Sequence, residues 1–244
     1  MSVSCGNARG IPWSGHLSTF STIGGVDART RAVGRLLAAL AYGERAAAHR
    51  ARENLRFAPD GRAREEQARV AEREEQNSRL MEARLTEVGS PEDAEQFRPF
   101  FDSFFERTQP EDWVEAQTWH YVGDALVSEF GEALVEVLDP VTAEIIKRTL
   151  GDRQDQESFA LDELKRAMDG DPRTTERIAA FARRIAGEAL TQTTAAMTET
   201  FVLRDLLESD GEKRMVLKLL DGHRARLDRL GVDRLDPDES ADGD

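Results

Sequence analysis

The chain has 244 residues, which suffices for one large domain with appendages, and its formal net charge is −14. Hydrophobic residues make up 39% and charged residues 33%, a composition typical of long amphipathic helices rather than of sheets. The negative charge opposes binding to nucleic acid, because such binding needs Lys and Arg at the phosphates.

Nothing in the sequence points to an oxidising compartment or to a membrane. The one cysteine, Cys5, excludes an internal disulfide and a cysteine-based zinc site. Residues 1–25 lack a cationic start followed by an apolar run, and no later stretch approaches the roughly 20 apolar residues of a membrane span. We therefore expect a soluble, cytoplasmic protein that does not enter a membrane.

Hydrophobic periodicity predicts six helices in chain order, which span about residues 28–55, 62–88, 111–138, 141–168, 173–207 and 213–230. Asp27 is the expected N-cap of the first helix, and Gly89 is the expected C-cap of the second. Between the second and third helices, "FRPFFDSFFERTQP" (97–110) is rich in phenylalanine. We expect this segment to form a short helix that lies across the bundle and seals one side of it.

The predicted fold class is all-α, a four-helix bundle with two additional C-terminal helices. We expect three segments: a disordered lead over residues 1–27, the helical bundle over 28–230, and a disordered acidic tail over 231–244. The lead is rich in Gly and Ser, and the tail is dominated by acidic side chains.

Four predicted helices carry polar residues on their apolar stripes near mid-length, whereas the neighbouring Glu72 falls on the opposite face. These inward residues are Glu44 on the first helix, Glu74 and Asn77 on the second, Asp124 on the third, and Gln154 and Glu157 on the fourth. Any one of them alone is explained by a satisfied core hydrogen bond. Together they predict a shared interior polar site, in which buried carboxylates need cations or protons. His120, one turn before Asp124, is best explained as a core histidine that donates to a carboxylate.

Several stretches carry a resemblance to a known family: "LAALAYGE", "WVEAQTWHYVGDALVSEF", "LDP" and "IAGEAL". They are similar to actinobacterial ferritin-like proteins related to the di-iron tRNA-modifying hydroxylases, which oxidise 2-methylthio-isopentenyl-adenosine. The resemblance implies a ferritin-like bundle with a di-iron centre held by a glutamate, two Glu-x-x-His motifs and a further acid. By position, Glu44, Glu74 and Asp124 match metal ligands. Asn77 stands at the first histidine, and Gln154 and Glu157 stand at the second Glu-x-x-His motif.

The replacement of both histidines leads to two hypotheses. The first is a metal-poor, non-catalytic binding or assembly protein that holds no cofactor. The alternative is an O₂-activating hydroxylase whose carboxylate-rich site holds two Fe or Mn ions through Glu44, Glu74, Asp124 and Glu157. The expected partner is an unidentified protein or small molecule. The resemblance implies tRNA, which the net charge disfavours, and a homodimer is left open.

Overall fold

The computed structural model describes residues 27–150, 153–171, 173–203, 206–207 and 210–232. These residues form helices and contain no strand, which confirms the predicted all-α class. The α-helices are α1 (Ala28–Asn54), α2 (Gly61–Val88), α3 (Arg98–Arg107), α4 (Trp113–Trp119), α5 (Ala125–Leu134), α6 (Pro140–Leu150), α7 (Gln154–Gly170), α8 (Arg173–Thr200) and α9 (Gly211–Leu230). The predicted disordered lead and acidic tail fall almost entirely outside the described residues.

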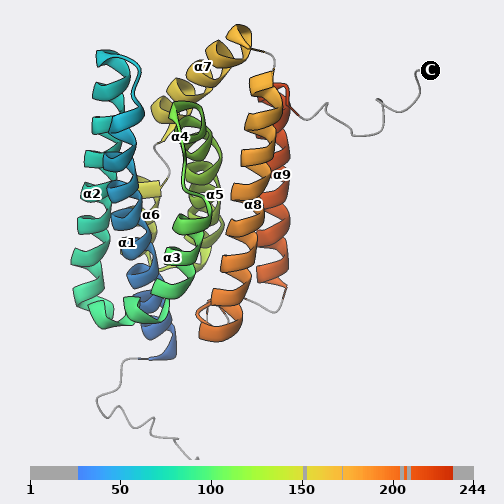
Figure 1. Cartoon of the computed structure of the whole chain (residues 1–244). Coiled ribbons are helices and arrows are strands. Elements are labelled where there is room, and N and C mark those ends of the chain that lie inside the picture. Colours follow the sequence, from blue (N-terminus) through green and yellow to red (C-terminus); the bar gives the residue numbers. More distant parts are fainter. Residues whose placement is uncertain (1–26, 151–152, 172, 204–205, 208–209, 233–244) are drawn as a thin grey trace, which may run out of the picture.

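Four helical arms form a bundle, and a second layer covers one side of it. The arms are α1, α2, α4 continued by α5, and α6 continued by α7, while α8 and α9 make the added layer (Figure 1). A buried ion pair between Arg226 and Glu129 joins α9 to α5 at 2.7 Å. The Tyr121 hydroxyl also donates to the Arg226 carbonyl at 3.2 Å. The described helices include none that is both long enough and apolar enough to cross a bilayer.

The first two helices pack closely because two glycines meet where α1 passes the end of α2. A Cβ added at Gly34 would lie 2.8 Å from the Gly89 Cα atom and 2.9 Å from the Val88 carbonyl oxygen. Asp27 accepts a hydrogen bond from the Thr30 amide at 2.9 Å, so the predicted N-cap is confirmed. Gly89 follows α2 as expected, in an extended conformation.

Two of the predicted helices are interrupted. The third contains a π-helical turn from His120 to Asp124 between α4 and α5. The fourth was expected to run unbroken over residues 141–168, but it is divided into α6 and α7. The predicted fifth helix, 173–207, ends earlier, at Thr200, and is followed by Phe201 with a positive φ of 54°.

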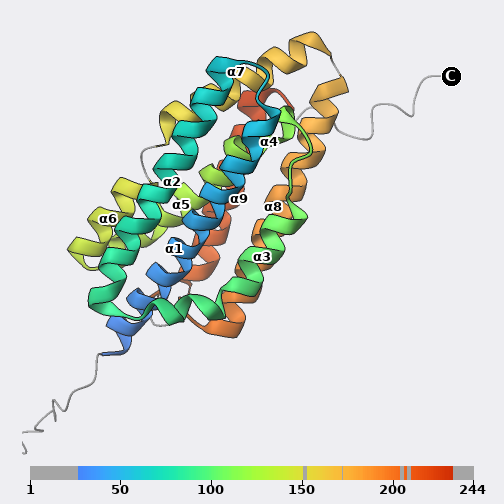
Figure 2. The ribbon, with the colours of Figure 1, turned by 60° about the vertical axis from the view of Figure 1, so that its left-hand side comes forward.

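The phenylalanine-rich helix α3 lies alongside α8 instead of crossing the bundle (Figure 2). Only Phe97, just before α3, is fully buried. The four phenylalanines on α3 itself are half-buried, namely Phe100, Phe101, Phe104 and Phe105. The expected short helix is confirmed, and Phe101, Phe104 and Phe105 pack against the core clusters. The expectation that it lies across the bundle is wrong, and its rings form one wall of a cavity.

The described core contains two large apolar clusters along the bundle axis and a small third one. One large cluster contains Leu36 and Leu40 of α1 together with Leu150 of α6, and the other contains Ala47 of α1 and Leu164 of α7. The third joins Ala51 of α1 to Val70 and Ala71 of α2. Each helical arm thus changes from one cluster to another near its mid-length. The polar residues of the predicted interior site occur at this level, as a layer between the two large clusters.

Replacing glycine by alanine should have opposite effects on stability at Gly34, where α1 approaches the end of α2, and at Gly187 on α8. Gly34→Ala should destabilise the protein by about 1–3 kcal/mol, because the new Cβ meets backbone atoms. Gly187→Ala should stabilise it by about 0.5–1 kcal/mol, because a Cβ there meets no atom of the described residues within 4 Å. Urea unfolding measures both, and equal effects at the two sites would show that the helices do not approach as described.

Candidate functional site

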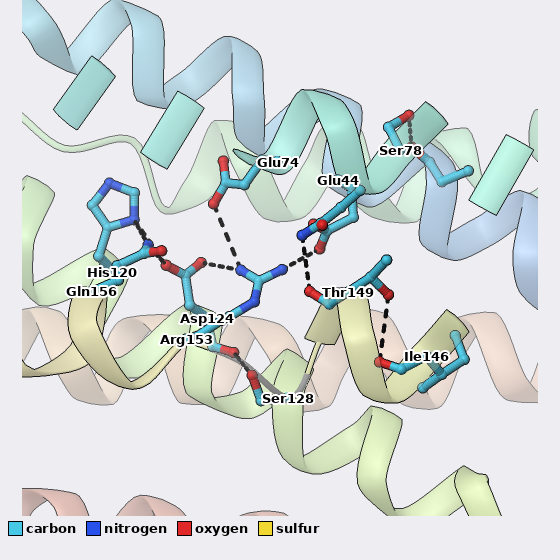
Figure 3. A network of polar contacts seen from close by, with 12 residues as sticks. Glu44, Glu74, Ser78, His120, Asp124, Ser128, Ile146, Thr149, Arg153 and Gln156 are labelled. Carbon is cyan, nitrogen blue, oxygen red and sulfur yellow. Dashed lines mark hydrogen bonds and ion pairs between the residues drawn. The ribbon is translucent and has the colours of Figure 1, made fainter. Parts of the chain in front are cut away.

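The polar layer brings one charged side chain from each helical arm to the same place (Figure 3). Glu44 comes from α1, Glu74 from α2, and Asp124 from the end of the π-helical turn. The fourth is Arg153, the residue immediately before α7. All four side chains are buried, and Glu74 has no exposed surface at all. The layer therefore holds three carboxyl groups and one guanidinium away from water.

The guanidinium of Arg153 lies among the three carboxyl groups (Figure 3). Its Nη2 atom donates to Glu44 Oε1 at 2.5 Å. Its Nη1 atom lies 3.4 Å from Asp124 Oδ1 and 3.7 Å from Glu74 Oε1. A planar guanidinium presents several donors in a fixed geometry, which suits contact with more than one carboxylate. Arg153 therefore supplies positive charge at the centre of the layer.

Asn77 ties three helices together at the edge of the same layer. Its amide Nδ2 donates to Glu44 Oε2 at 3.0 Å and to the Thr149 carbonyl at 2.8 Å. Both protons of the amide are thereby used, one toward α1 and one toward the last turn of α6. This amide holds the Glu44 carboxylate from the side opposite Arg153.

His120 is buried among polar partners on both of its ring nitrogens. Its Nε2 atom lies 3.0 Å from Gln67 Nε2, which also donates to the Ala51 carbonyl at 3.1 Å. Its Nδ1 atom lies 2.9 Å from Asp124 Oδ2 and 3.0 Å from Gln156 Nε2. A core histidine beside the Asp124 carboxylate is the arrangement expected from the sequence.

Burial changes the protonation of the layer. It raises the pKa of Glu74 well above its ordinary value, and the negative charge of Asp124 adds to this effect. Burial also raises the pKa of Glu44, although Arg153 opposes the shift. For Arg153 burial acts downward, but the three carboxyl groups outweigh it and keep the pKa above the ordinary value. Neither Glu74 oxygen has a hydrogen-bond partner among the described residues.

The structure brings together four of the residues predicted for the interior site: Glu44, Glu74, Asn77 and Asp124. It does not bring in the two predicted from the fourth helix. Gln154 is exposed. The Glu157 side chain is 30% exposed and pairs with Arg229 of α9 at 2.5 Å. The expectation that these two face the common interior is wrong, because the interruption between α6 and α7 changes which side of the fourth arm faces inward.

Two residues missed in the sequence take the inward positions instead. Arg153 enters the layer from the start of α7, and Gln156 follows one turn later. Gln156 donates to Asp124 Oδ2 from the same side as His120. A glycine at position 151 is the sequence signal that could have indicated the interruption, since glycine weakens a helix interior.

The residues present do not fit a pair of metal ions. A dinuclear carboxylate centre needs several ligand atoms with free lone pairs, usually including histidine nitrogens. Here Glu44 is held by Arg153 and Asn77, and Asp124 by His120 and Gln156. The His120 nitrogens are used by Asp124 and Gln67. Within the described part of the chain, one group of ligand atoms lies within 4.8 Å of one another, from Glu74, His120 and Asp124. These three donors suffice for one ion at most.

The fold and the buried carboxyl layer define a class of protein, the ferritin-like helical bundles. The family model described as "Ferritin-like domain, actinomycetes" matches residues 27–210. The chain therefore belongs to this family. A comparison with curated proteins found no match.

The raised pKa of Glu74 predicts how stability depends on pH. A carboxyl group whose folded pKa is raised contributes stability below its unfolded pKa of 4.5, and loses it as the pH rises through the folded pKa. Glu74→Gln should therefore gain on the wild type as the pH rises above the unfolded pKa, by about 1–3 kcal/mol. Chemical unfolding in chelator, at several pH values, measures this difference.

Glu72→Gln is the matched control, because Glu72 is exposed on the same helix. It should change stability by less than about 0.5 kcal/mol. If Glu74→Gln instead loses stability as the pH rises, Glu74 is ionised in the folded protein and its attraction to Arg153 exceeds the effect of burial.

Proposed function

We propose that this ferritin-fold protein is a binding protein without catalytic metal, in which Arg153 supplies the positive charge that metal ions supply in di-iron bundles. The observation that supports this proposal is the buried guanidinium among Glu44, Glu74 and Asp124. Three buried carboxyl groups near one another need compensation. The guanidinium and the protonation of raised-pKa carboxyl groups provide it without an ion.

The alternative is an O₂-activating hydroxylase with a carboxylate-rich metal site. One observation favours it: Glu74 is fully buried, neither of its oxygens has a hydrogen bond among the described residues, and it lies close to Asp124 and His120. Such a site needs Arg153 to leave and His120 to exchange its present hydrogen bonds for a metal. The finer relationship to tRNA-modifying hydroxylases stays a prediction, and the net charge of −14 weighs against an RNA partner.

Metal content tests the two functions directly. Protein purified from iron-supplemented cells should contain well under one Fe or Mn ion per chain by elemental analysis. A content of about two ions per chain, as in di-iron bundles, contradicts the proposal and supports the hydroxylase.

Replacing the central arginine tests the proposed charge substitution. Arg153→Gln should lose about 3–5 kcal/mol of stability in chelator, because three buried carboxyl groups lose their cation. Added Mn²⁺ should then restore stability in proportion to its binding, whereas the wild type should not respond. Thermal and urea unfolding with and without Mn²⁺ measure both effects.

Arg166→Gln is the control, since Arg166 lies on α7 with 61% of its side chain exposed. It should change stability by less than about 1 kcal/mol and should not respond to Mn²⁺. Arg153→Lys keeps a charge and should fold if Arg153→Gln does not. A wild type that Mn²⁺ stabilises as strongly as it does the variant contradicts the proposal.

A further inference from the structure

A cavity of about 200 Å³ lies beside the polar layer, between the bundle and the added helices. Its walls come from α1, α3, α5, α8 and α9. For comparison, an engineered apolar cavity of roughly 150 Å³ binds benzene. The space is therefore large enough for a small organic molecule.

The cavity walls are mostly apolar, and small side chains leave the space open. Ala47 lines it from α1, and Ala189 and Ala196 line it from α8. The half-buried phenylalanines of α3 form the wall between these two helices. Leu220 of α9, also in the lining, is 39% exposed, so the cavity reaches the surface there. A hydrocarbon body can enter on this side and lose contact with water.

One end of the cavity is polar. Glu44, Asp124 and Arg153 are part of its lining. The Arg153 side chain is 6% exposed. Its guanidinium donates hydrogen bonds, and the carboxylate oxygens of Glu44 and Asp124 accept them. This end of the cavity thus combines a guanidinium with carboxylate acceptors.

The charges at this end select the head group of a ligand. Two carboxyl groups and one guanidinium line the cavity, and Glu74 lies behind them, so a ligand carboxylate adds negative charge to an excess of acids. A hydroxyl group adds no charge. It accepts from the Arg153 guanidinium and donates to a neighbouring carboxylate oxygen, so it uses both kinds of group.

We propose that the cavity binds a small apolar alcohol, with its hydrocarbon body against the α3 and α8 walls and its hydroxyl at Arg153. The body corresponds to about one aromatic ring or a chain of about six to eight carbons, on the scale of the benzene-binding cavity. This inference rests on the proposed binding function and names the class of ligand for it.

Calorimetric titration of the full chain with 1-octanol and with octanoate tests the proposal. 1-Octanol should bind saturably at one site per chain, and octanoate should bind at least about tenfold more weakly. Ala189→Phe fills the cavity and should weaken 1-octanol binding by about tenfold or more. Ala180→Phe, the same change at an exposed position of α8, should leave binding unchanged.

Three results overturn the proposal: no saturable 1-octanol binding, octanoate binding as tightly as 1-octanol, or equal losses in the two Phe variants. Circular dichroism checks that Ala189→Phe is folded, and Ala196→Leu replaces it if it is not. The test is separate from the metal analysis. A metal-loaded protein that binds 1-octanol contradicts the proposed function alone, whereas a metal-free protein that does not bind contradicts this inference alone.

Discussion

The buried guanidinium of Arg153 is the interaction on which the rest of the structure depends. It contacts carboxyl groups from three helical arms, and it comes from the fourth. Removing any one carboxyl group changes the charge balance of the others, so the four arms are coupled electrostatically at one level of the bundle. The two large apolar clusters lie along the bundle axis, and the charged layer favours the register that brings the four groups together. Whether such layers add stability or only specificity differs between proteins, because desolvation offsets much of the attraction.

Much of the fold follows from the sequence because helical periodicity is a local property. Glu44, Glu74 and Asn77 lie on long helices without interruption, so counting residues along the apolar stripe places them inward. Asp124 was also placed correctly, although a π-helical turn separates α4 from α5. Its position survives because it lies within one turn of His120, which faces the same interior.

The rest of the site depends on the interruption between α6 and α7, which hydrophobic periodicity does not reveal. A stripe extrapolated through residues 141–168 predicts Gln154 and Glu157 inward, but the division between α6 and α7 turns Arg153 and Gln156 inward instead. An arginine is also a residue that sequence reasoning assigns to the surface, because its charge is costly to bury unless partners are present. Those partners come from three other helices, so no local window reveals them. The same limit applies to α3, which was expected to lie across the bundle and instead lies alongside α8.

The cavity and the charged layer are not independent features, because Glu44, Asp124 and Arg153 belong to both. The apolar walls of the cavity lack the packing contacts that larger neighbouring side chains would make. Larger side chains at Ala189 or Ala196 would fill part of this space and restore such contacts. In the proposed binding function, the apolar body of the ligand supplies the contacts that the small side chains leave out.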